Sequence, residues 1–244
     1  MAKLAYVTGG MGGIGTAICR KFHVAGYKVI AGCGPTRDHA KWLAEQKSDG
    51  YAFSASVGNV ADWESTREAF EKVKAEQGVV DILVNNAGIT RDGVFRKMSL
   101  DDWRAVIDTN LNSLFNVTKQ VIDGMLEKGW GRIVNIASVN GEKGQFGQTN
   151  YSAAKAGMHG FSMALAQEVA SKGVTVNTVS PGYIATDMVM AVREDVREKI
   201  IQTIPVKRLG RAEEIGSVCV WLSGDDAGFT TGAEFSCNGG LHMG

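Results

Sequence analysis

A phenol and an ammonium four positions apart are the pair in this sequence best suited to proton transfer. Tyr151 and Lys155 stand at i and i+4, so on a helix their side chains share one face. A free tyrosine has a pKa of about 10 and is a poor acid–base catalyst at neutral pH. A neighbouring ammonium would stabilise the phenolate and lower that pKa, which would make Tyr151 a usable proton donor to a carbonyl oxygen. The same spacing also arises by chance in surface pairs.

A serine hydroxyl precedes this tyrosine by thirteen residues, at the end of a predicted strand. Ser138 could hydrogen-bond the same carbonyl oxygen as Tyr151. Its context is Ile-Ala-Ser-Val-Asn rather than G-x-S-x-G, and no histidine has a triad-like setting. The sequence therefore excludes a serine hydrolase, and the histidines are expected to be structural or solvent-facing.

Five glycines crowd residues 8–15, directly after the first predicted strand. Glycine lets the backbone pass close to a pyrophosphate, and the start of the following helix supplies free N–H groups and a partial positive charge. The spacing is G-x-x-x-G-x-G rather than the general G-x-G-x-x-G fingerprint. A tight turn would also need glycines, but the position after the first strand of a βαβ series favours a dinucleotide site.

The region after the second predicted strand indicates which dinucleotide would bind. An acidic residue there would hydrogen-bond the 2′-hydroxyl of NAD. Residues 31–37 contain no carboxylate and end in Arg37. A guanidinium without a competing acid suits a 2′-phosphate, which predicts NADP(H) as the cofactor. Alternatively, Arg37 is a solvated residue that opens a helix.

Short apolar runs alternate with helix-length segments along the whole chain. This alternation indicates parallel strands joined by right-handed crossovers. We predict an α/β fold, a doubly wound parallel sheet (Rossmann fold) with helices on both faces, as a single dinucleotide-binding and catalytic domain over residues 1–244. Strands are expected at 3–8, 27–33, 51–56, 80–84, 132–137, 174–179 and 233–236, and helices at 13–25, 37–47, 63–76, from 99 towards 129, 151–170, 194–203 and 212–222.

Composition excludes several other classes of protein. The chain has 26 basic and 26 acidic residues, so it lacks the basic excess of a nucleic-acid binder. A hydrophobic share of 44% excludes a disordered chain. The four cysteines have no zinc-like spacing, which predicts reduced thiols and no metal. Without a signal sequence or an apolar run of membrane-spanning length, we expect no membrane association and a cytoplasmic location.

The motifs together resemble the short-chain dehydrogenase/reductase family, in order and along essentially the whole chain. They include Asn85-Asn86-Ala87-Gly88 after the fourth strand and Pro181-Gly182 after the sixth, which in isolation would read as ordinary turns. The resemblance implies that Tyr151 donates the proton, that Ser138 orients the carbonyl, and that Lys155 binds the nicotinamide ribose and lowers the tyrosine pKa. It also implies that Asn110 holds a water linking the lysine to solvent. Asn110 falls inside the long predicted helix, where a buried asparagine is unfavourable, which fits a functional role.

The resemblance also implies the cofactor contacts. Asn59 and Val60 would border the adenine, and residues 86–88 would let the backbone approach the adenosine ribose. Residues 181–186 would wrap the nicotinamide, with Ile184 and Thr186 bonding its carboxamide. The full predicted cofactor set is Gly9, Gly12, Gly13, Ile14, Gly15, Arg37, Asn59, Val60, Asn86, Ala87, Gly88, Ile89, Thr90, Tyr151, Lys155, Pro181, Gly182, Ile184 and Thr186.

Within the family, four stretches are most similar to the reductases that convert acetoacetyl-CoA to (R)-3-hydroxybutyryl-CoA with NADPH in polyhydroxybutyrate biosynthesis: residues 87–92, 130–135, 144–151 and 238–244. This similarity implies acetoacetyl-CoA or a related 3-ketoacyl thioester as substrate, and a homotetramer. Reductases of 3-oxoacyl-acyl-carrier proteins share most of these stretches but need a basic docking patch. A non-catalytic NADP-binding regulatory protein would tolerate loss of the catalytic residues, all of which are present. A sugar or steroid reductase is a further alternative, because substrate loops vary more than the scaffold.

The predicted substrate contacts lie on loops expected to border the site. Gln145 and Gln148 could bind a thioester oxygen, and Phe146 could pack a short acyl chain or a pantetheine arm. Solvated loop polarity and a core anchor explain these residues equally well. Arg193 is the leading candidate for the CoA phosphates, ahead of Lys97 and Lys143. The full predicted substrate set is Asp92, Ser138, Gln145, Phe146, Gln148, Tyr151, Tyr183 and Arg193.

Overall fold

The computed structural model describes residues 2–243; Met1 and Gly244, the two ends of the predicted domain, lie outside the described residues. Within that range, seven strands form one sheet in the order β3-β2-β1-β4-β5-β6-β7, and every pair is parallel. The predicted doubly wound α/β fold is confirmed. The strand order reverses between β1 and β4, the position at which such sheets bind ligands. The strands are β1 (Leu4–Val7), β2 (Lys28–Cys33), β3 (Ser54–Val57), β4 (Ile82–Asn85), β5 (Gly131–Ile136), β6 (Val174–Pro181) and β7 (Glu234–Cys237).

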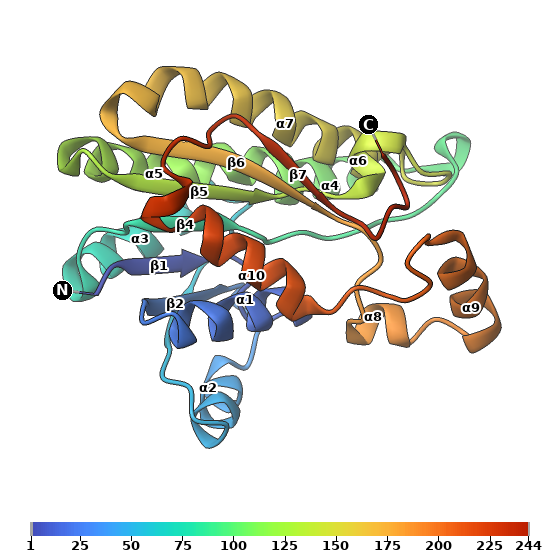
Figure 1. Ribbon diagram of the computed structural model, residues 1–244, viewed down its shortest axis with the longest axis horizontal. Coiled ribbons are helices and arrows are strands. Elements are labelled where there is room, and N and C mark those ends of the chain that lie inside the picture. The colour runs from blue at the N-terminus through green and yellow to red at the C-terminus, as the bar shows by residue number, and fades with distance from the viewer. Residues whose placement is uncertain (1, 244) are drawn as a thin grey trace.

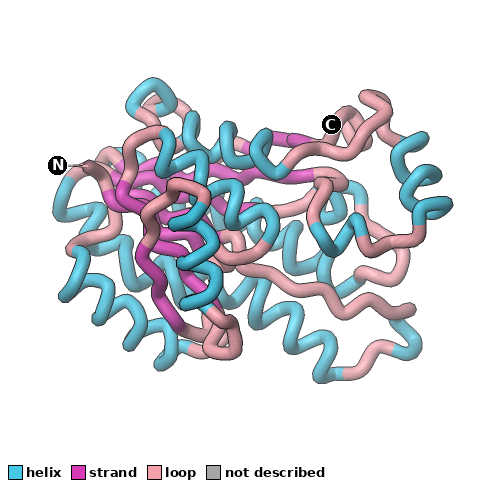
Figure 2. Tube along the Cα trace, turned by 90° about the horizontal axis from the view of Figure 1, so that it is seen from below, coloured by secondary structure: helices cyan, strands magenta, loops and turns pink. Residues whose placement is uncertain are grey.

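Helices cover both faces of the sheet (Figure 1), and in Figure 2 the strands run between the helical layers. One layer contains α1 and α10, and the opposite layer contains α3, α5 and α7. The helices are α1 (Gly13–Val24), α2 (His39–Ser48), α3 (Trp63–Gln77), α4 (Leu100–Ile107), α5 (Ser113–Lys128), α6 (Val139–Lys143), α7 (Thr149–Val169), α8 (Asp187–Met190), α9 (Glu194–Thr203) and α10 (Ala212–Leu222).

Strand β1 illustrates how an apolar sequence builds both layers. Successive side chains of a strand point to opposite faces, so a strand covered on both sides is apolar throughout. Ala5 and Val7 belong to the core with α1 and α10, whereas Leu4 and Tyr6 pack with α3, α5 and α7. The carboxyl ends of the strands are left to the loops that build the site.

Three local features differ from the prediction. Helix α2 begins at His39 rather than at residue 37, because the Asp38 side chain accepts a hydrogen bond from the Lys41 backbone N–H and caps the helix. The long helix predicted from residue 99 is interrupted by a π-helical turn, Asp108–Asn112, between α4 and α5. Helices α6 and α8 were not predicted, and Ser138 is the N-cap of α6 rather than the last residue of β5.

Within residues 2–243, no helix has the length and apolarity needed to cross a membrane. In the same part of the chain, no group of three or more histidine, cysteine, aspartate or glutamate side chains is arranged to hold a metal ion.

Candidate active site

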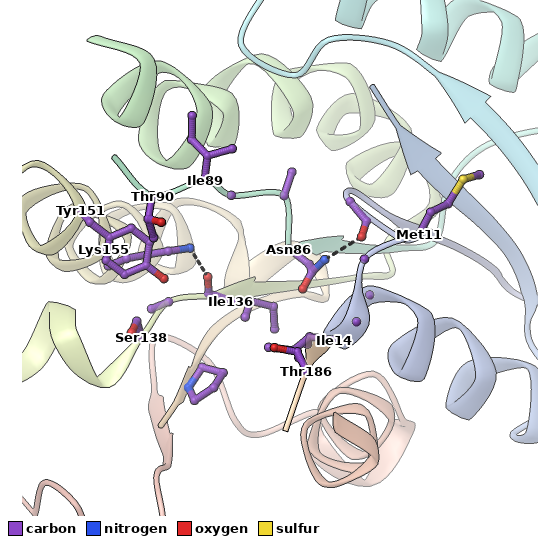
Figure 3. A pocket seen from close by; sticks show the side chains of 18 of the residues that line it. Met11, Ile14, Asn86, Ile89, Thr90, Ile136, Ser138, Tyr151, Lys155 and Thr186 are labelled. Carbon is purple, nitrogen blue, oxygen red and sulfur yellow. Dashed lines mark hydrogen bonds between the residues drawn. The ribbon is translucent and has the colours of Figure 1, made fainter. Parts of the chain in front are cut away.

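A pocket of about 450 Å³ at the carboxyl ends of the strands collects most of the predicted residues (Figure 3). Its walls come from the loops after β1 and β4, from Ser138, from α7 and from the segment after β6. The predicted residues that line it are Gly9, Gly12, Gly13, Ile14, Gly15, Arg37, Asn86, Ala87, Gly88, Ile89, Thr90, Ser138, Tyr151, Lys155, Pro181, Gly182 and Thr186. Met11 and Asp187 also line it and were not predicted: Met11 lies within the glycine motif but is not one of its glycines, and Asp187 follows the motif at residues 181–186.

Several predicted residues lie outside this pocket. Asn59 and Val60 line an adjoining pocket together with Gly58 and residues 87–89, which is consistent with the expected adenine position. Tyr183 and Ile184 line a separate cavity between α10 and β7, and Ile184 is buried. The Ile184 side chain therefore packs in the core and does not face the main pocket.

The glycine loop is shaped by close backbone contacts that no side chain could enter. A Cβ at Gly15 would lie 2.1 Å from the Gly9 carbonyl oxygen, and one at Gly13 would lie 2.9 Å from Thr186 Cγ2. Gly9 has a φ of 60°, a conformation that favours glycine. Within the described chain, no side chain caps the start of α1. Bare backbone and uncapped N–H groups therefore face the pocket, which fits the pyrophosphate of a dinucleotide.

Asn86 and Asn110 hold the loop after β4 against this cradle. Asn86 Nδ2 donates to the carbonyl oxygens of Thr8 and Gly9 at 2.9 and 3.1 Å. Asn110 is fully buried in the π-helical turn; its Nδ2 donates to the Ile89 carbonyl at 2.9 Å, and its Oδ1 accepts from the Ile89 N–H at 3.3 Å. Nδ2 also donates to the Val106 carbonyl oxygen at 2.8 Å, so both hydrogens of the Asn110 amide have acceptors. These backbone bonds explain why a polar side chain is tolerated inside the helical region.

Helix α7 presents Tyr151 and Lys155 on one face, and both side chains reach the pocket (Figure 3). Lys155 Nζ lies 5.6 Å from the centroid of the Tyr151 ring and donates to the Ile136 carbonyl oxygen at 2.7 Å. The predicted shared face is therefore present. The lysine also reaches across to the end of β5, which fixes its ammonium beside the tyrosine.

The direction of the Tyr151 pKa differs from the prediction. Burial raises the pKa of Tyr151, a hydrogen bond with Ser138 lowers it, and the Asp92 carboxylate raises it. Burial also lowers the pKa of Lys155 to about 7. Desolvation dominates because both groups are enclosed by protein. The predicted lowering of the tyrosine pKa by Lys155 is therefore wrong here, and at neutral pH the phenol keeps the proton that a donor needs.

Lys155→Met should change how stability depends on pH. Burial lowers the lysine pKa from its ordinary 10.5 to about 7 in the folded protein. Between these values the unfolded chain binds more protons, so the free energy of unfolding rises with pH, by up to about 1.4 kcal/mol per unit. We expect urea unfolding between about pH 7 and 8.5 to show this rise in the wild type and in the exposed-lysine control Lys172→Met, but not in Lys155→Met. Equal pH dependence in all three proteins would show that Lys155 does not cause the rise in stability with pH.

The residues predicted to bind substrate have several different environments. Phe146 is 86% exposed, so the alternative that it anchors the core is wrong. Gln145 Oε1 accepts from Lys143 Nζ at 2.9 Å. Arg193 is exposed and forms a two-point ion pair with Asp195, which partly satisfies the guanidinium predicted to meet CoA phosphates.

Gln148 and Asp92 contact one another, and neither is among the residues that line the pocket. Gln148 Nε2 donates to Asp92 Oδ2, and Gln148 Oε1 accepts from Asn140 Nδ2, both at 2.9 Å. Sequence reasoning missed Asn140, whose only signal was its position two residues after Ser138.

The fold, the glycine cradle and the tyrosine–lysine pair define a class of protein. The chain matches the family model described as short chain dehydrogenase over residues 3–197, and it belongs to that family, as the sequence predicted. It is therefore an oxidoreductase that acts between an alcohol and a carbonyl group with a nicotinamide cofactor.

Individual relatives within the family differ in how similar they are to this chain. The chain is 72% identical to the acetoacetyl-CoA reductase of Cupriavidus necator, covering 99% of each chain. It is 52% identical to the acetoacetyl-CoA reductase of Allochromatium vinosum over 100% of both chains. Identity falls to 46% with the 3-oxoacyl-[acyl-carrier-protein] reductase of Salmonella typhimurium, over 99% of this chain and 98% of the relative.

Proposed function

We propose that this protein reduces the 3-keto group of acetoacetyl-CoA, or of a related 3-ketoacyl-CoA, to the (R)-3-hydroxyacyl thioester with NADPH. The observation that carries the proposal is the 72% identity to an acetoacetyl-CoA reductase over 99% of both chains. Asn110, Ser138, Tyr151 and Lys155, which the family resemblance makes the catalytic tetrad, are all present. The first lies behind the loop after β4, and the other three line the pocket.

The chain's own residues supply binding, orientation and the proton. A bound dinucleotide would supply the hydride. Tyr151, whose pKa is raised by burial, would donate its proton to the carbonyl oxygen, and Ser138 would hydrogen-bond the same oxygen. Lys155 uses one ammonium hydrogen on the Ile136 carbonyl and one on Met158 Sδ, which leaves one for a ribose hydroxyl. Asn110, already bonded to Ile89, would hold a water between the lysine and solvent.

NADP(H) is the proposed dinucleotide because of Arg37. The guanidinium donates to the Met11 carbonyl oxygen at 2.8 Å, which places it at the edge of the pocket beside Cys33 and Gly34. No acidic side chain accompanies these residues in the lining described after β2. A positive charge at this edge suits a 2′-phosphate.

We further infer that residues 1–244 act as one domain, in the cytoplasm, as part of polyhydroxybutyrate biosynthesis and as a homotetramer. Self-association is supported by exposed aromatic surface on α3 and α5, where Trp63 and Phe115 stack with ring centroids 5.7 Å apart and Phe115 is 57% exposed. Large exposed apolar groups that lie together often mark an interface.

The substrate proposal is tested by comparing two thioesters of the same acyl group. We expect kcat/KM with NADPH to be at least about tenfold higher for acetoacetyl-CoA than for acetoacetyl-acyl-carrier protein, a preference worth about 1.4 kcal/mol. Initial rates of NADPH oxidation measure both. The reverse preference would assign the protein to the carrier-protein reductases. The absence of turnover with either thioester would favour a binding-only regulatory protein.

A further inference from the structure

Three hydrogen bonds tie the loop after β4 to the start of α7 and the segment before it. The Gly93 N–H donates to the Gly147 carbonyl at 2.8 Å, and Asn150 Nδ2 donates to the Arg91 carbonyl at 3.0 Å. The third is the 2.9 Å bond between Gln148 Nε2 and Asp92 Oδ2. The two segments are distant in sequence, so these bonds fix how they lie relative to one another.

From this junction a chain of polar contacts leads inward to the catalytic serine. Gln148 Oε1 accepts from Asn140 Nδ2 at 2.9 Å, and the Asn140 backbone N–H donates to Ser138 Oγ at 3.2 Å. A serine hydroxyl has one hydrogen to donate. Because Ser138 Oγ already accepts the Asn140 N–H, its hydrogen is left for Tyr151 or for a carbonyl oxygen in the pocket.

The outer end of the chain carries a charge that also acts on the tyrosine. The Asp92 carboxylate raises the pKa of Tyr151. A carboxylate is also the strongest acceptor available to an amide N–H, so it fixes which end of the Gln148 amide faces outward. Gln148 is then committed at both ends, to Asp92 through Nε2 and to Asn140 through Oε1.

We propose that Asp92, Gln148 and Asn140 are positioning residues that hold the start of α6 in place and thereby orient the Ser138 hydroxyl. Gln148 would then act through its protein partners, whereas the sequence predicts that it binds the thioester. This inference deepens the proposed function and rests on it for the carbonyl that Ser138 meets. Its distinguishing feature is the direction of the bond from Gln148 to Asp92, which substitutions can reverse.

The test compares Gln148→Glu with the double variant Asp92→Asn/Gln148→Glu. The single substitution removes the donor and sets two carboxylates against each other, so we expect kcat to fall about tenfold or more. In the double variant the asparagine amide can donate to the new carboxylate, which restores the bond with reversed polarity. We expect it to recover most of the lost kcat. Gln167→Glu, the same change on the exposed side of α7, serves as the control and should leave kcat unchanged.

Each variant is assayed with acetoacetyl-CoA and with ethyl acetoacetate, which carries the 3-keto group without CoA. Loss and recovery of kcat with both substrates would support the positioning chain. No loss, loss without recovery, or a rise in KM for acetoacetyl-CoA alone would overturn it and favour direct binding by Gln148. If the wild type reduced ethyl acetoacetate but not acetoacetyl-CoA, the proposed substrate would be wrong while the loss-and-recovery test still applied.

Discussion

Tyr151→Phe should lower the turnover of acetoacetyl-CoA by about two to four orders of magnitude, the usual contribution of a general acid. The substitution removes one oxygen and keeps the ring that packs beside Lys155. Ser138 and Lys155 would remain in the pocket, but neither replaces a neutral phenol that holds its proton at pH 7. Steady-state rates with saturating NADPH and acetoacetyl-CoA measure the loss in kcat.

Cofactor binding and an unrelated tyrosine provide the controls for this variant. NADPH affinity, measured by fluorescence titration, should change little because the glycine cradle is untouched. Tyr51→Phe makes the same chemical change at a ring that stacks on Phe53, away from the pocket, and should keep normal turnover. Near-normal turnover in Tyr151→Phe would show that another group delivers the proton.

Arg37→Asp should reduce the preference for NADPH over NADH by about 100-fold. Hydrogen bonds to charged groups contribute about 1.5–3 kcal/mol, which corresponds to roughly 10- to 150-fold in affinity. The new carboxylate would also repel a 2′-phosphate and could accept a bond from the 2′-hydroxyl of NADH. The preference is measured as the ratio of kcat/KM values for the two cofactors with the same ketone substrate.

Lys41→Asp is the matched control, because it reverses the same charge on an exposed residue in the first turn of α2. This variant should keep the wild-type cofactor ratio. If Arg37→Asp weakened NADPH and NADH equally, the guanidinium would only brace the Met11 carbonyl and the argument for NADP would fail.

The parts that the sequence predicted well depend on local pattern. Apolar runs such as β1, which is buried on both faces, predict a parallel sheet covered by helices. The glycine spacing predicts the dinucleotide-binding loop at the start of α1. The spacing of Tyr151 and Lys155 correctly predicted that they share a face. The position of Ser138 at the end of a predicted strand suggested that it would act with them, whereas a role for Asn110 was predicted only by the family resemblance.

The parts that were missed depend on tertiary contacts. The direction of the Tyr151 pKa follows from burial, which a four-residue spacing does not reveal. Helix α6 has only five residues, too few to show a helical period. The hydrogen bonds of Gln148 with Asp92 and Asn140 require two loops to lie side by side, and the order of strands in the sheet determines that contact.

The π-helical turn between α4 and α5 changes the rotational alignment of α5 relative to α4 within one continuous helical segment. The Asn110 amide must face the Ile89 backbone, while α5 must lay Leu114, Val117 and Val121 on the sheet. Each residue of an α-helix advances by about 100°. If Asp108–Asn112 continued as a regular α-helix, the apolar stripe of α5 would be rotated by about that angle relative to α4. The wider π-helical turn therefore absorbs one extra residue. Asn110 can bond Ile89 while the apolar face of α5 packs on the sheet, within a single continuous segment.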